Sequence, residues 1–297
     1  MHTLKVAVSG ATGFVGRHVV AALERAGIEP TLWLGPGSAV PDRWRRHRVA
    51  RIDVHAPPAD AFAQLGVPDA LIHLAWQGLP NYASLHHFER EGPAHYAVLK
   101  SLVEHGLGAL VVAGTCFEYG MQSGPLDEAR PALPANAYAL AKDTLRRELE
   151  QLQRQRSYAL TWARLFYLHG EGQAETALWP QLRRAAESGA ATFPMSGGEQ
   201  LRDYLPVEQA ASHLVALALQ RRGHGVVNVC SGAPIAVRSL VERWIAEHGW
   251  SIRPDLGRYP YPAHEPMAFW GDPTKLRRCL QGDAAPAAYD REPKEER

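Results

Sequence analysis

The chain has 297 residues, and its 32 Lys and Arg residues balance 31 Asp and Glu residues to a formal net charge of +1. Hydrophobic residues make up 46% of the chain, and its mean hydropathy is -0.26. A chain of this length and composition can bury a full α/β core. Its nearly neutral charge gives no electrostatic basis for a nucleic-acid or membrane partner.

The cysteines and the N-terminal residues bear on location. Cys116, Cys230 and Cys279 are too few and too widely spaced for a disulfide framework or a zinc site. The N-terminal apolar stretch is shorter than a signal peptide requires, and the sequence has no run of about 20 apolar residues. We therefore expect a cytoplasmic protein with reduced thiols and no bound metal.

Three glycines with the spacing Gly-x-x-Gly-x-x-Gly follow an apolar run at residues 4–9. Gly10 permits a tight turn, Gly13 lets the backbone approach a pyrophosphate, and Gly16 lets the following helix pack near the sheet. Free N–H groups and the helix dipole then favour a phosphate. A glycine turn between any strand and helix is the alternative interpretation. An apolar stripe at helical spacing, ended by Gly27, favours a dinucleotide site.

The segment after the second predicted strand, residues 30–34, bears on which dinucleotide binds. Residues 35–38 lack the acidic side chain that an NAD site usually uses for the ribose hydroxyls. Four arginines follow, at Arg43, Arg45, Arg46 and Arg48. We expect NADP(H) to be preferred, with NAD(H) as the alternative, although a solvated basic loop also explains the arginines. Asp53, at the end of a third predicted strand (residues 49–54), is placed to reach an adenine amino group.

Two further apolar segments, residues 69–75 and 109–113, are typical of parallel strands covered on both faces. Strand and helix patterns alternate through this half, which predicts an α/β fold with a Rossmann-type doubly wound parallel sheet. Ligands of such sheets gather at the carboxyl ends of the strands. Trp76 follows the first of these strands and Thr115 the second, so both should face the ligand.

A predicted helix after Asn136 carries Tyr138 and Lys142. Residues four apart lie on one face of a helix, one turn from each other. This spacing is common by chance, and a tyrosine stacked over a lysine stem is the alternative interpretation. Its combination with the glycine spacing and with Thr115 at a strand end favours a catalytic pair.

Beyond residue 168 the sequence becomes loop-rich, but a predicted helix at residues 207–220 and an apolar strand at 226–230 return to the sheet. We expect residues 1–168 to form mainly an NAD(P)-binding Rossmann domain. Residues 169–281 should form mainly a smaller, loop-rich substrate-binding lobe, with segments that return to the Rossmann domain. The end, residues 282–297, is predicted to be a disordered tail.

Together these residues resemble the extended short-chain dehydrogenase/reductase family, in its nucleotide-sugar epimerase, dehydratase and reductase branch. In the second half, residues 164–170 look like the family's RxxNxYG segment and residues 202–207 like its RDFxxV segment. The resemblance implies a nucleotide-sugar substrate whose phosphates contact Arg202. Two positions depart from the pattern, since Tyr167 replaces the family's asparagine and His169 replaces its tyrosine.

The resemblance also implies roles for individual residues. Thr115 would hold the substrate oxygen, and Tyr138 with Lys142 would transfer a proton, Lys142 also gripping the nicotinamide ribose. The residues expected to bind the cofactor are Gly10, Thr12, Gly13, Phe14, Val15, Gly16, Arg43, Asp53, Val54, Leu74, Ala75, Tyr138 and Lys142. Those expected to bind the substrate are Trp76, Cys116, Phe117, Glu118, Tyr167 and Arg202.

The chemistry we expect is NADPH-dependent reduction of a nucleotide-linked 4-keto-(6-deoxy) sugar. Tyr138 would donate a proton to the carbonyl oxygen, and Lys142 would lower the pKa of the tyrosine from about 10. Sugar 4,6-dehydratases of the family carry Asp-Glu directly after the threonine, where this chain has Cys116 and Phe117. Elimination of water is therefore disfavoured. Glu118, expected on the same side of an extended segment as Cys116, would bind a sugar hydroxyl or pair with an arginine at the rim.

Three alternatives stay open. A nucleotide-sugar 4-epimerase would keep NAD(P) tightly bound and would oxidise and then re-reduce the sugar. Ring epimerisation would use Cys116 as acid or base, although a buried structural thiol is the simpler interpretation. A non-catalytic NADP-sensing regulator would use the same fold but would not need Thr115, Tyr138 and Lys142 together.

A homodimer is also expected from the resemblance, because helices like those starting near Ser84 and Asn136 often pair as a four-helix bundle. On the first of them, Tyr96, Leu99 and Val103 form an apolar stripe. Burial within the same subunit explains this stripe nearly as well.

Overall fold

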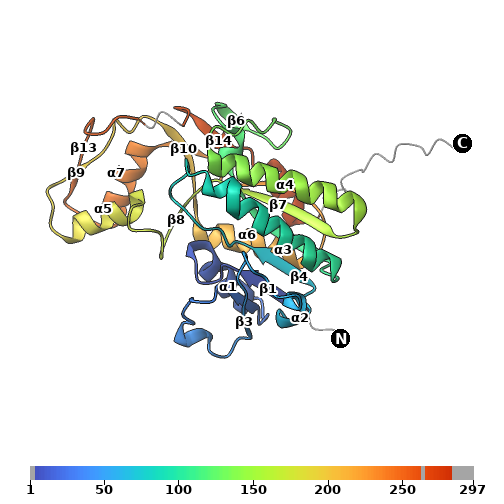
Figure 1. The fold of residues 1–297 in the computed structure, drawn as a ribbon. Coiled ribbons are helices and arrows are strands. Elements are labelled where there is room, and N and C mark those ends of the chain that lie inside the picture. Colours follow the sequence, from blue (N-terminus) through green and yellow to red (C-terminus); the bar gives the residue numbers. More distant parts are fainter. Residues whose placement is uncertain (1–3, 262–264, 283–297) are drawn as a thin grey trace, which may run out of the picture.

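The computed structural model describes residues 4–261 and 265–282. A seven-stranded sheet with the strand order β11-β7-β5-β4-β1-β2-β3 forms its centre (Figure 1). Every neighbouring pair of these strands is parallel. The strands are β1 (Val6–Ser9), β2 (Thr31–Leu34), β3 (Val49–Arg51), β4 (Ala70–His73), β5 (Ala109–Thr115), β7 (Ala159–Leu165) and β11 (Gly225–Val229). The order runs outward from β1 in both directions, which confirms the Rossmann-type doubly wound sheet.

Helices cover both faces of this sheet. One face packs against α1 (Phe14–Arg25) and α6 (Val207–Leu219), the other against α3 (Gly92–Glu104) and α4 (Ala137–Gln155). Alternate residues of a strand point to opposite faces. Val6 and Val8 therefore join the core under α1 and α6, whereas Ala7 joins the core under α3 and α4. Burial on both faces is why the strands read as continuous apolar runs.

The turn between β1 and α1 has the geometry that the glycine spacing predicts. Gly10 has a φ of 67°, and a Cβ there would lie 2.8 Å from the backbone nitrogen of Ala75. A Cβ on Gly16 would overlap the carbonyl oxygen of Gly10, so only glycine lets α1 approach the turn this closely. Gly27, with a φ of 75°, follows the C-cap residue Ala26 and ends the helix.

A smaller lobe lies to one side of the sheet, on the left of Figure 1. Its own apolar core includes Leu182, Phe193, Leu240 and Trp244. The lobe contains α5 (Leu178–Glu187), α7 (Val237–Glu247), β9 (Thr192–Pro194) and β13 (Arg253–Asp255). A three-stranded sheet of β8 (Tyr167–His169), β10 (Leu201–Pro206) and β12 (Pro234–Ala236) lies between the lobe and the main sheet, and β6 (Gly124–Leu126) pairs with β14 (Phe269–Gly271). The shorter helices are α2 (Ala61–Gln64), α8 (Thr274–Gln281), η1 (Asp42–Trp44), η2 (His87–Glu91) and η3 (Cys116–Tyr119).

The chain passes between the two parts more than once. Residues up to Leu165 supply six of the seven strands, and β11, α6 and α8 join the Rossmann part from the second half. Apart from Gly282, the predicted tail lies outside the described residues. Within the described part of the chain, no helix is long and apolar enough to span a bilayer.

The helix expected to start near Ser84 is confirmed, because the π-helix η2 (His87–Glu91) continues directly into α3 (Gly92–Glu104). The apolar stripe on α3 points inward: Leu99 and Val103 are buried in the core shared with α4, and Tyr96 packs against that core. Burial within one subunit therefore explains the stripe, which gives no support to a dimer.

Candidate active site

The carboxyl ends of β1 and β4 form one continuous surface with the glycine turn. Ser9 ends β1, and its Oγ accepts the N–H groups of Leu74 at 3.1 Å and Ala75 at 3.3 Å. No side chain caps the start of α1, so its first N–H groups are free to bind an anion. The outward side of Gly13 is open, since a Cβ there would meet only Gly10 O, at 3.1 Å. This surface fits the pyrophosphate of a dinucleotide. Thr12, Phe14 and Val15 are partly exposed beside it.

Thr115 ends β5, and Tyr138 lies in the first turn of α4. Asn136 caps that helix by accepting the N–H of Ala139 at 2.9 Å. Burial, helped by the charge of Glu118, raises the pKa of Tyr138 well above its ordinary value, although a hydrogen bond with the Thr115 side chain opposes this. Tyr138 is therefore a neutral phenol, the form that can donate a proton.

Lys142 lies one turn after Tyr138 and is 2% exposed. Its ammonium donates to Ala113 O at 2.9 Å and lies 4.0 Å from the centroid of the Trp76 ring. Burial lowers the pKa of Lys142 to about 7, and the charges of Glu118 and Glu91 oppose this shift. The expected lowering of the tyrosine pKa by the lysine is not found, because burial favours the neutral form of both groups.

Glu118 does not lie at the substrate face. The helix η3 turns the chain after Thr115, so the alternation expected of an extended segment does not apply. The carboxylate is fully buried and accepts Thr115 N–H at 2.8 Å, Trp162 Nε1–H at 2.9 Å and Arg164 Nε–H at 2.7 Å. The expected contact with a sugar hydroxyl or a rim arginine is therefore wrong. Glu118 fixes the backbone of Thr115 through the N–H of that residue, and its ion-pair partner is Arg164, a buried arginine of β7.

Cys116 and Phe117 cannot supply the acid and base of a dehydratase. Burial, together with the charges of Glu265 and Asp203, raises the pKa of the Cys116 thiol far above its ordinary value. Its thiol is buried in the apolar cluster that also contains Tyr119 and Phe166, which favours the structural interpretation of this cysteine. Phe117 is apolar and packs against other rings.

A line of aromatic rings runs from Tyr138 towards the lobe. The ring of Tyr82 lies 5.6 Å from that of Tyr138 and 5.1 Å from that of Phe117, which in turn lies 6.2 Å from Tyr167. Tyr167 then contacts Tyr204 of β10 at 5.3 Å. Tyr82 was not among the residues predicted from the sequence, although it lies in the loop after a buried parallel strand, where ligands of such sheets gather.

Arg202 of β10 lies at the lobe end of these rings. Its side chain is 4% exposed, and its Nη2 pairs with Glu265 Oε2 at 2.8 Å. Nη1 donates to Leu201 O at 2.8 Å and Met267 O at 3.3 Å. The partner carboxylate of Glu265 was not foreseen, and no motif in the sequence marks it.

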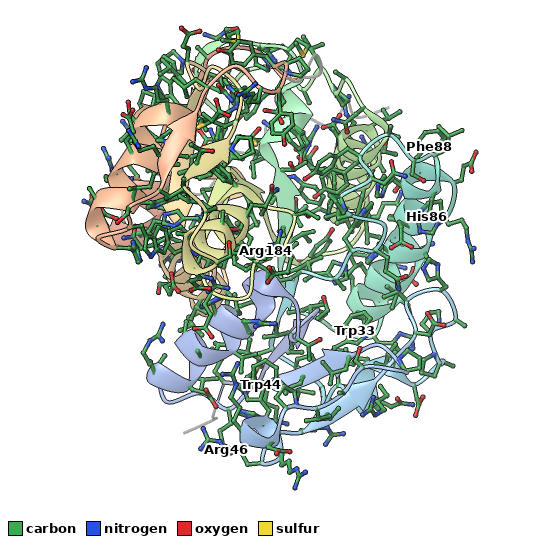
Figure 2. The ribbon with its side chains drawn as sticks, turned by 90° about the vertical axis from the view of Figure 1, so that its left-hand side faces the viewer. Trp33, Trp44, Arg46, His86, Phe88 and Arg184 are labelled. Carbon is green, nitrogen blue, oxygen red and sulfur yellow. The ribbon has the colours of Figure 1, made fainter. Side chains whose placement is uncertain are left out.

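The arginines after β2 are largely engaged elsewhere. Three of them have partners: Arg45 pairs with Asp42, Arg46 with Glu24, and Arg48 donates to the carbonyls of Ala63 and Gln64. Arg43 lies over the Trp44 ring at 4.9 Å. Figure 2 shows Trp44 and Arg46 at the lower end of the molecule.

Another arginine contacts the loop after β2. Arg51, which the sequence analysis did not single out, donates to Pro36 O at 3.1 Å and to Ser38 O at 2.8 Å. Asp53 follows β3 and accepts the N–H of His55 at 2.9 Å, and Val54 is partly buried beside it. Within residues 4–261 and 265–282, no group of three or more His, Cys, Asp or Glu side chains is arranged to hold a metal ion.

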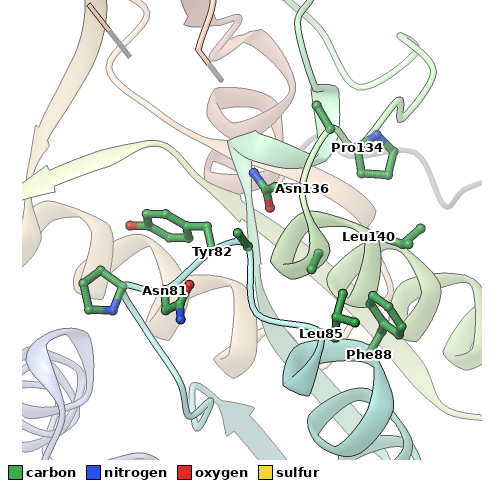
Figure 3. Close-up of a pocket in the computed structure, with 11 residues that line it drawn as sticks. Asn81, Tyr82, Leu85, Phe88, Pro134, Asn136 and Leu140 are labelled. Atoms are coloured by element: carbon green, nitrogen blue, oxygen red, sulfur yellow. The ribbon is translucent and has the colours of Figure 1, made fainter. Parts of the chain in front are cut away.

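An apolar pocket lies on the outer side of Tyr82 (Figure 3). It is lined by Pro80, Asn81, Tyr82, Ala83, Leu85, Phe88, Pro134, Ala135, Asn136, Ala137 and Leu140. Leu85, Phe88 and Leu140 gather on one side of it and are 55%, 38% and 45% exposed. In Figure 3 the ring of Tyr82 extends away from these three residues.

A doubly wound sheet with a glycine turn after its central strand, and a Tyr-Lys pair on a helix beside a threonine at a strand end, define an extended short-chain dehydrogenase/reductase. The model of the NAD dependent epimerase/dehydratase family matches residues 6–230, and the chain belongs to this family.

Among curated proteins, the chain is 28% identical over 270 residues to a dTDP-6-deoxy-L-talose 4-dehydrogenase (NAD(+)) of Aggregatibacter actinomycetemcomitans, covering 90% of this chain and 99% of that protein. It is 24% identical to a UDP-glucose 4-epimerase of Halalkalibacterium halodurans, covering 92% and 86%. Among solved structures, MoeE5 in complex with UDP-glucuronic acid and NAD superposes with a TM-score of 0.79 at 23% identity, covering 93% of this chain and 92% of MoeE5. That likeness supports the fold.

Proposed function

We propose that this protein is an NAD(P)-dependent reductase that acts on the 4-keto group of a nucleotide-linked 6-deoxy sugar. The observation that carries the proposal is the pairing of a neutral Tyr138 phenol with the Thr115 hydroxyl at the carboxyl end of β5. A neutral phenol is ready to protonate a carbonyl oxygen that becomes an alkoxide. The similarity to a 4-dehydrogenase of a dTDP-linked 6-deoxy sugar supports the position of the chemistry, since such a dehydrogenase and a 4-keto reductase run one reaction in opposite directions.

In the proposed mechanism the bound nicotinamide supplies the hydride. Thr115 donates a hydrogen bond to the carbonyl oxygen at C4, and Tyr138 transfers its phenolic proton to that oxygen. Lys142 stabilises the phenolate that remains, and its position over the face of Trp76 keeps the ammonium beside the reacting groups. Glu118 holds Thr115 through its backbone N–H.

The substrate's diphosphate is assigned to Arg202. A guanidinium binds phosphate through parallel N–H donors, and Arg202 already offers these donors to Glu265. A nucleotide sugar would replace the carboxylate on the guanidinium. Trp76, Phe117, Tyr167 and Tyr82 then supply rings along the sugar, and Cys116 serves only as packing below them.

For the cofactor we propose a preference for NADP(H), with the glycine turn, Leu74, Ala75, Tyr138 and Lys142 as its contacts. Residues 35–38 carry no carboxylate to repel a 2′-phosphate, and Arg51 donates into this loop while Arg43 has no carboxylate partner among the described residues. The NAD(+) in the name of the similar 4-dehydrogenase favours the alternative. Titration of the protein with NADPH and with NADH compares the two affinities. An NADH affinity equal to or higher than that for NADPH would contradict the proposed preference.

A second candidate function is nucleotide-sugar 4-epimerisation, favoured by the similarity to UDP-glucose 4-epimerases. An epimerase returns the hydride to the same sugar, so it works without net consumption of cofactor and keeps the dinucleotide through purification. The reductase instead releases it after each turnover.

The deciding experiment incubates the protein with NADPH or NADH and a panel of 4-keto-6-deoxy sugars linked to dTDP, GDP, CDP or UDP. Oxidation of the reduced cofactor at 340 nm, with a product heavier by two hydrogens, is the expected result. Conversion of a UDP-hexose to its 4-epimer without cofactor consumption would favour the epimerase. Cofactor binding without turnover of any sugar nucleotide would favour the remaining alternative, a non-catalytic NADP-sensing regulator.

We also propose a homodimer, through a surface other than the stripe first considered. Leu85, Phe88 and Leu140 are exposed apolar residues around the ends of η2 and α4, and Figure 2 shows Phe88 at the outer surface. Pairing of this surface with its copy would remove these side chains from water. Light scattering at micromolar concentration should give the dimer mass, and Leu140→Glu should give the monomer. A monomeric wild-type protein would contradict the proposal.

A further inference from the structure

A chain of buried polar side chains runs under the cofactor surface and takes no part in the mechanism above. Ser9 Oγ lies 2.8 Å from His73 Nδ1, His73 Nε2 lies 2.7 Å from His95 Nδ1, and His95 Nε2 lies 3.3 Å from Glu91 Oε2. All four residues are at most 1% exposed. We call these four residues the buried chain.

The ionisation of the buried chain is set by Glu91 at its far end. Burial opposes the charge of Glu91, but hydrogen bonds from His95 and from Gln77 N–H hold its pKa at about 2. Burial lowers the pKa of His95, and lowers that of His73 well below its ordinary value. The buried chain therefore consists of one carboxylate, two neutral imidazoles and one hydroxyl.

These charge states fix the direction of every hydrogen bond. A carboxylate only accepts, so His95 donates from Nε2 and, being neutral, must accept at Nδ1. His73 then donates from Nε2 and accepts at Nδ1, which leaves Ser9 to donate its hydroxyl proton to His73. Both lone pairs of Ser9 Oγ are thereby free for the N–H groups of Leu74 and Ala75.

Reversal of this direction would weaken the hydrogen bonds that Ser9 Oγ accepts from the two amides, of which only Leu74 N–H has a second acceptor, Ser9 O at 3.3 Å. If His95 carried a second proton, it would donate from Nδ1 to His73, and His73 would donate from Nδ1 to Ser9. Three donors would then compete for the two lone pairs of one hydroxyl oxygen, which would weaken the contact with Ala75 N–H most.

Glu91 also fixes Gln77, which ends the segment of residues 74–77 that begins with the amides of Leu74 and Ala75. Its Oε2 accepts the N–H of Gln77 at 3.1 Å. Between the two ends, the ring of Trp76 is stacked on that of His95, with centroids 4.7 Å apart and planes at 16°. The indole N–H donates to His87 Nδ1 at 3.1 Å, and its face covers the ammonium of Lys142. Every residue from Leu74 to Gln77 is thus fixed by the buried chain or by its neighbour His87.

The second carboxylate oxygen of Glu91 faces the surface. Glu91 Oε1 lies 2.8 Å from His55 Nε2 and 3.0 Å from His86 Nε2, and these histidine side chains are 23% and 33% exposed. Figure 2 shows His86 at the outer surface of the molecule. Two imidazole nitrogens therefore lie within ion-pair distance of the carboxylate on its outer side.

We infer that Glu91 is a positioning residue, which fixes the tautomers of His95 and His73 and so holds residues 74–77 in the shape that receives the nicotinamide ribose and Lys142. The inference rests on the proposed cofactor site, because residues 74–77 matter to function only if a dinucleotide lies on them. Glu91 acts on the cofactor surface through these two imidazoles and through its hydrogen bond to Gln77 N–H.

The direct test reads the two tautomers in the intact protein. With ¹⁵N-labelled histidine at pH 7, His73 and His95 should both give the signature of a neutral ring protonated at Nε2. Glu91→Gln removes the charge and keeps the shape, and should convert part of each signal to the other tautomer. The matched control is Glu89→Gln, since Glu89 is exposed and two residues away. A wild-type His95 that is protonated at Nδ1 or doubly protonated would overturn the inference.

Cofactor affinity supplies the functional readout, and it needs no sugar substrate. Glu91→Gln should weaken dinucleotide binding about tenfold, since small displacements at a preorganised site have effects of this size, whereas Glu89→Gln should leave it unchanged. Equal affinities of the two variants would overturn the inference. If the wild-type protein binds neither NAD(H) nor NADP(H), the proposed function itself fails, while the tautomer measurement still tests the buried chain.

A second pair of variants applies if Glu91→Gln does not fold. Ser9→Ala removes the acceptor of the two amides and the donor to His73, and should weaken dinucleotide binding about tenfold. Ser9→Thr keeps a hydroxyl at the same position and should restore affinity to within about threefold. Ser9→Ala with wild-type affinity would show that the amide contacts do not position the segment, which overturns the inference.

Discussion

Two buried arginine–carboxylate pairs flank the candidate site. They differ in whether the carboxylate is free to be displaced by a ligand. Arg164 Nε lies 2.7 Å from Glu118 Oε2, with side chains 3% and 0% exposed. Arg202 Nη2 lies 2.8 Å from Glu265 Oε2, with side chains 4% and 14% exposed. The first carboxylate also accepts from Thr115 N–H and from Trp162, so it has no capacity for a ligand. The second pair lies at the border with the smaller lobe, where an incoming diphosphate can take the place of a carboxylate.

In the function proposed above, the first pair positions Thr115 and the second keeps Arg202 available for the substrate, and these two roles predict different results. Loss of the carboxylate from a buried pair leaves an uncompensated charge in the core. Loss of a carboxylate that competes with substrate releases the arginine for binding.

The largest effect should come from Glu118→Gln, which leaves Arg164 without a carboxylate in the core. We expect the free energy of unfolding to fall by about 3–5 kcal/mol, measured by denaturant titration. Glu265→Gln is the matched control and should lower it by less, because the Glu265 side chain is 14% exposed and water can reach the guanidinium that loses its partner. Equal losses in the two variants would remove the distinction between the pairs.

Tyr138 lies between the two pairs and should affect only the rate. Tyr138→Phe keeps the ring and removes the proton donor, so we expect turnover to fall about 100-fold or more with cofactor affinity nearly unchanged. Steady-state kinetics with a 4-keto sugar nucleotide and cofactor titration measure the two quantities. Tyr82→Phe is the control, since the chemistry proposed above gives its hydroxyl no proton to transfer. Wild-type turnover in Tyr138→Phe would exclude this residue as the donor.

Substitutions of Arg202 and of Glu265 should change the affinity for a nucleotide sugar in opposite directions. Arg202→Gln should weaken nucleotide-sugar binding about tenfold or more, because a charge-assisted hydrogen bond is lost. Glu265→Gln should strengthen binding a few-fold, because the carboxylate no longer competes for the guanidinium. Calorimetric titration with a nucleoside diphosphate sugar compares them. Weaker binding in both variants would mean that Glu265 helps to bind the substrate and does not compete with its diphosphate for Arg202.

The smallest effect concerns Lys142 and pH. Burial lowers its pKa to about 7, so the ammonium is present below that pH and is lost as pH rises through it. The charges that face it are those of Glu118 and Glu91, with His73 and His95 nearby. Dinucleotide affinity should therefore fall by up to about eightfold between pH 6.5 and 8. Lys142→Met should bind more weakly and without this pH dependence. An unchanged wild-type affinity over the range would contradict the assignment of Lys142 to the ribose.

The sequence by itself determined the sheet, the glycine turn and the Tyr-Lys pair, because each depends on local rules. Runs such as residues 109–113 are apolar throughout, which a strand buried on both faces requires. Gly10 and Gly16 stand where the backbone comes too close for a Cβ. Tyr138 and Lys142 share a helical face because of their spacing alone.

Tertiary structure alone decided the partners of charged and polar side chains. Glu118 and Glu265 are both acidic residues near the site, but one is enclosed by β7 and the other meets Arg202 across 63 residues of sequence. Ser9, His73, His95 and Glu91 come from two strands, a helix and the π-helix before it, so no local pattern joins them. The stripe of Tyr96, Leu99 and Val103 was amphipathic in the sequence, but only the position of α4 determined that it faces the core of its own subunit.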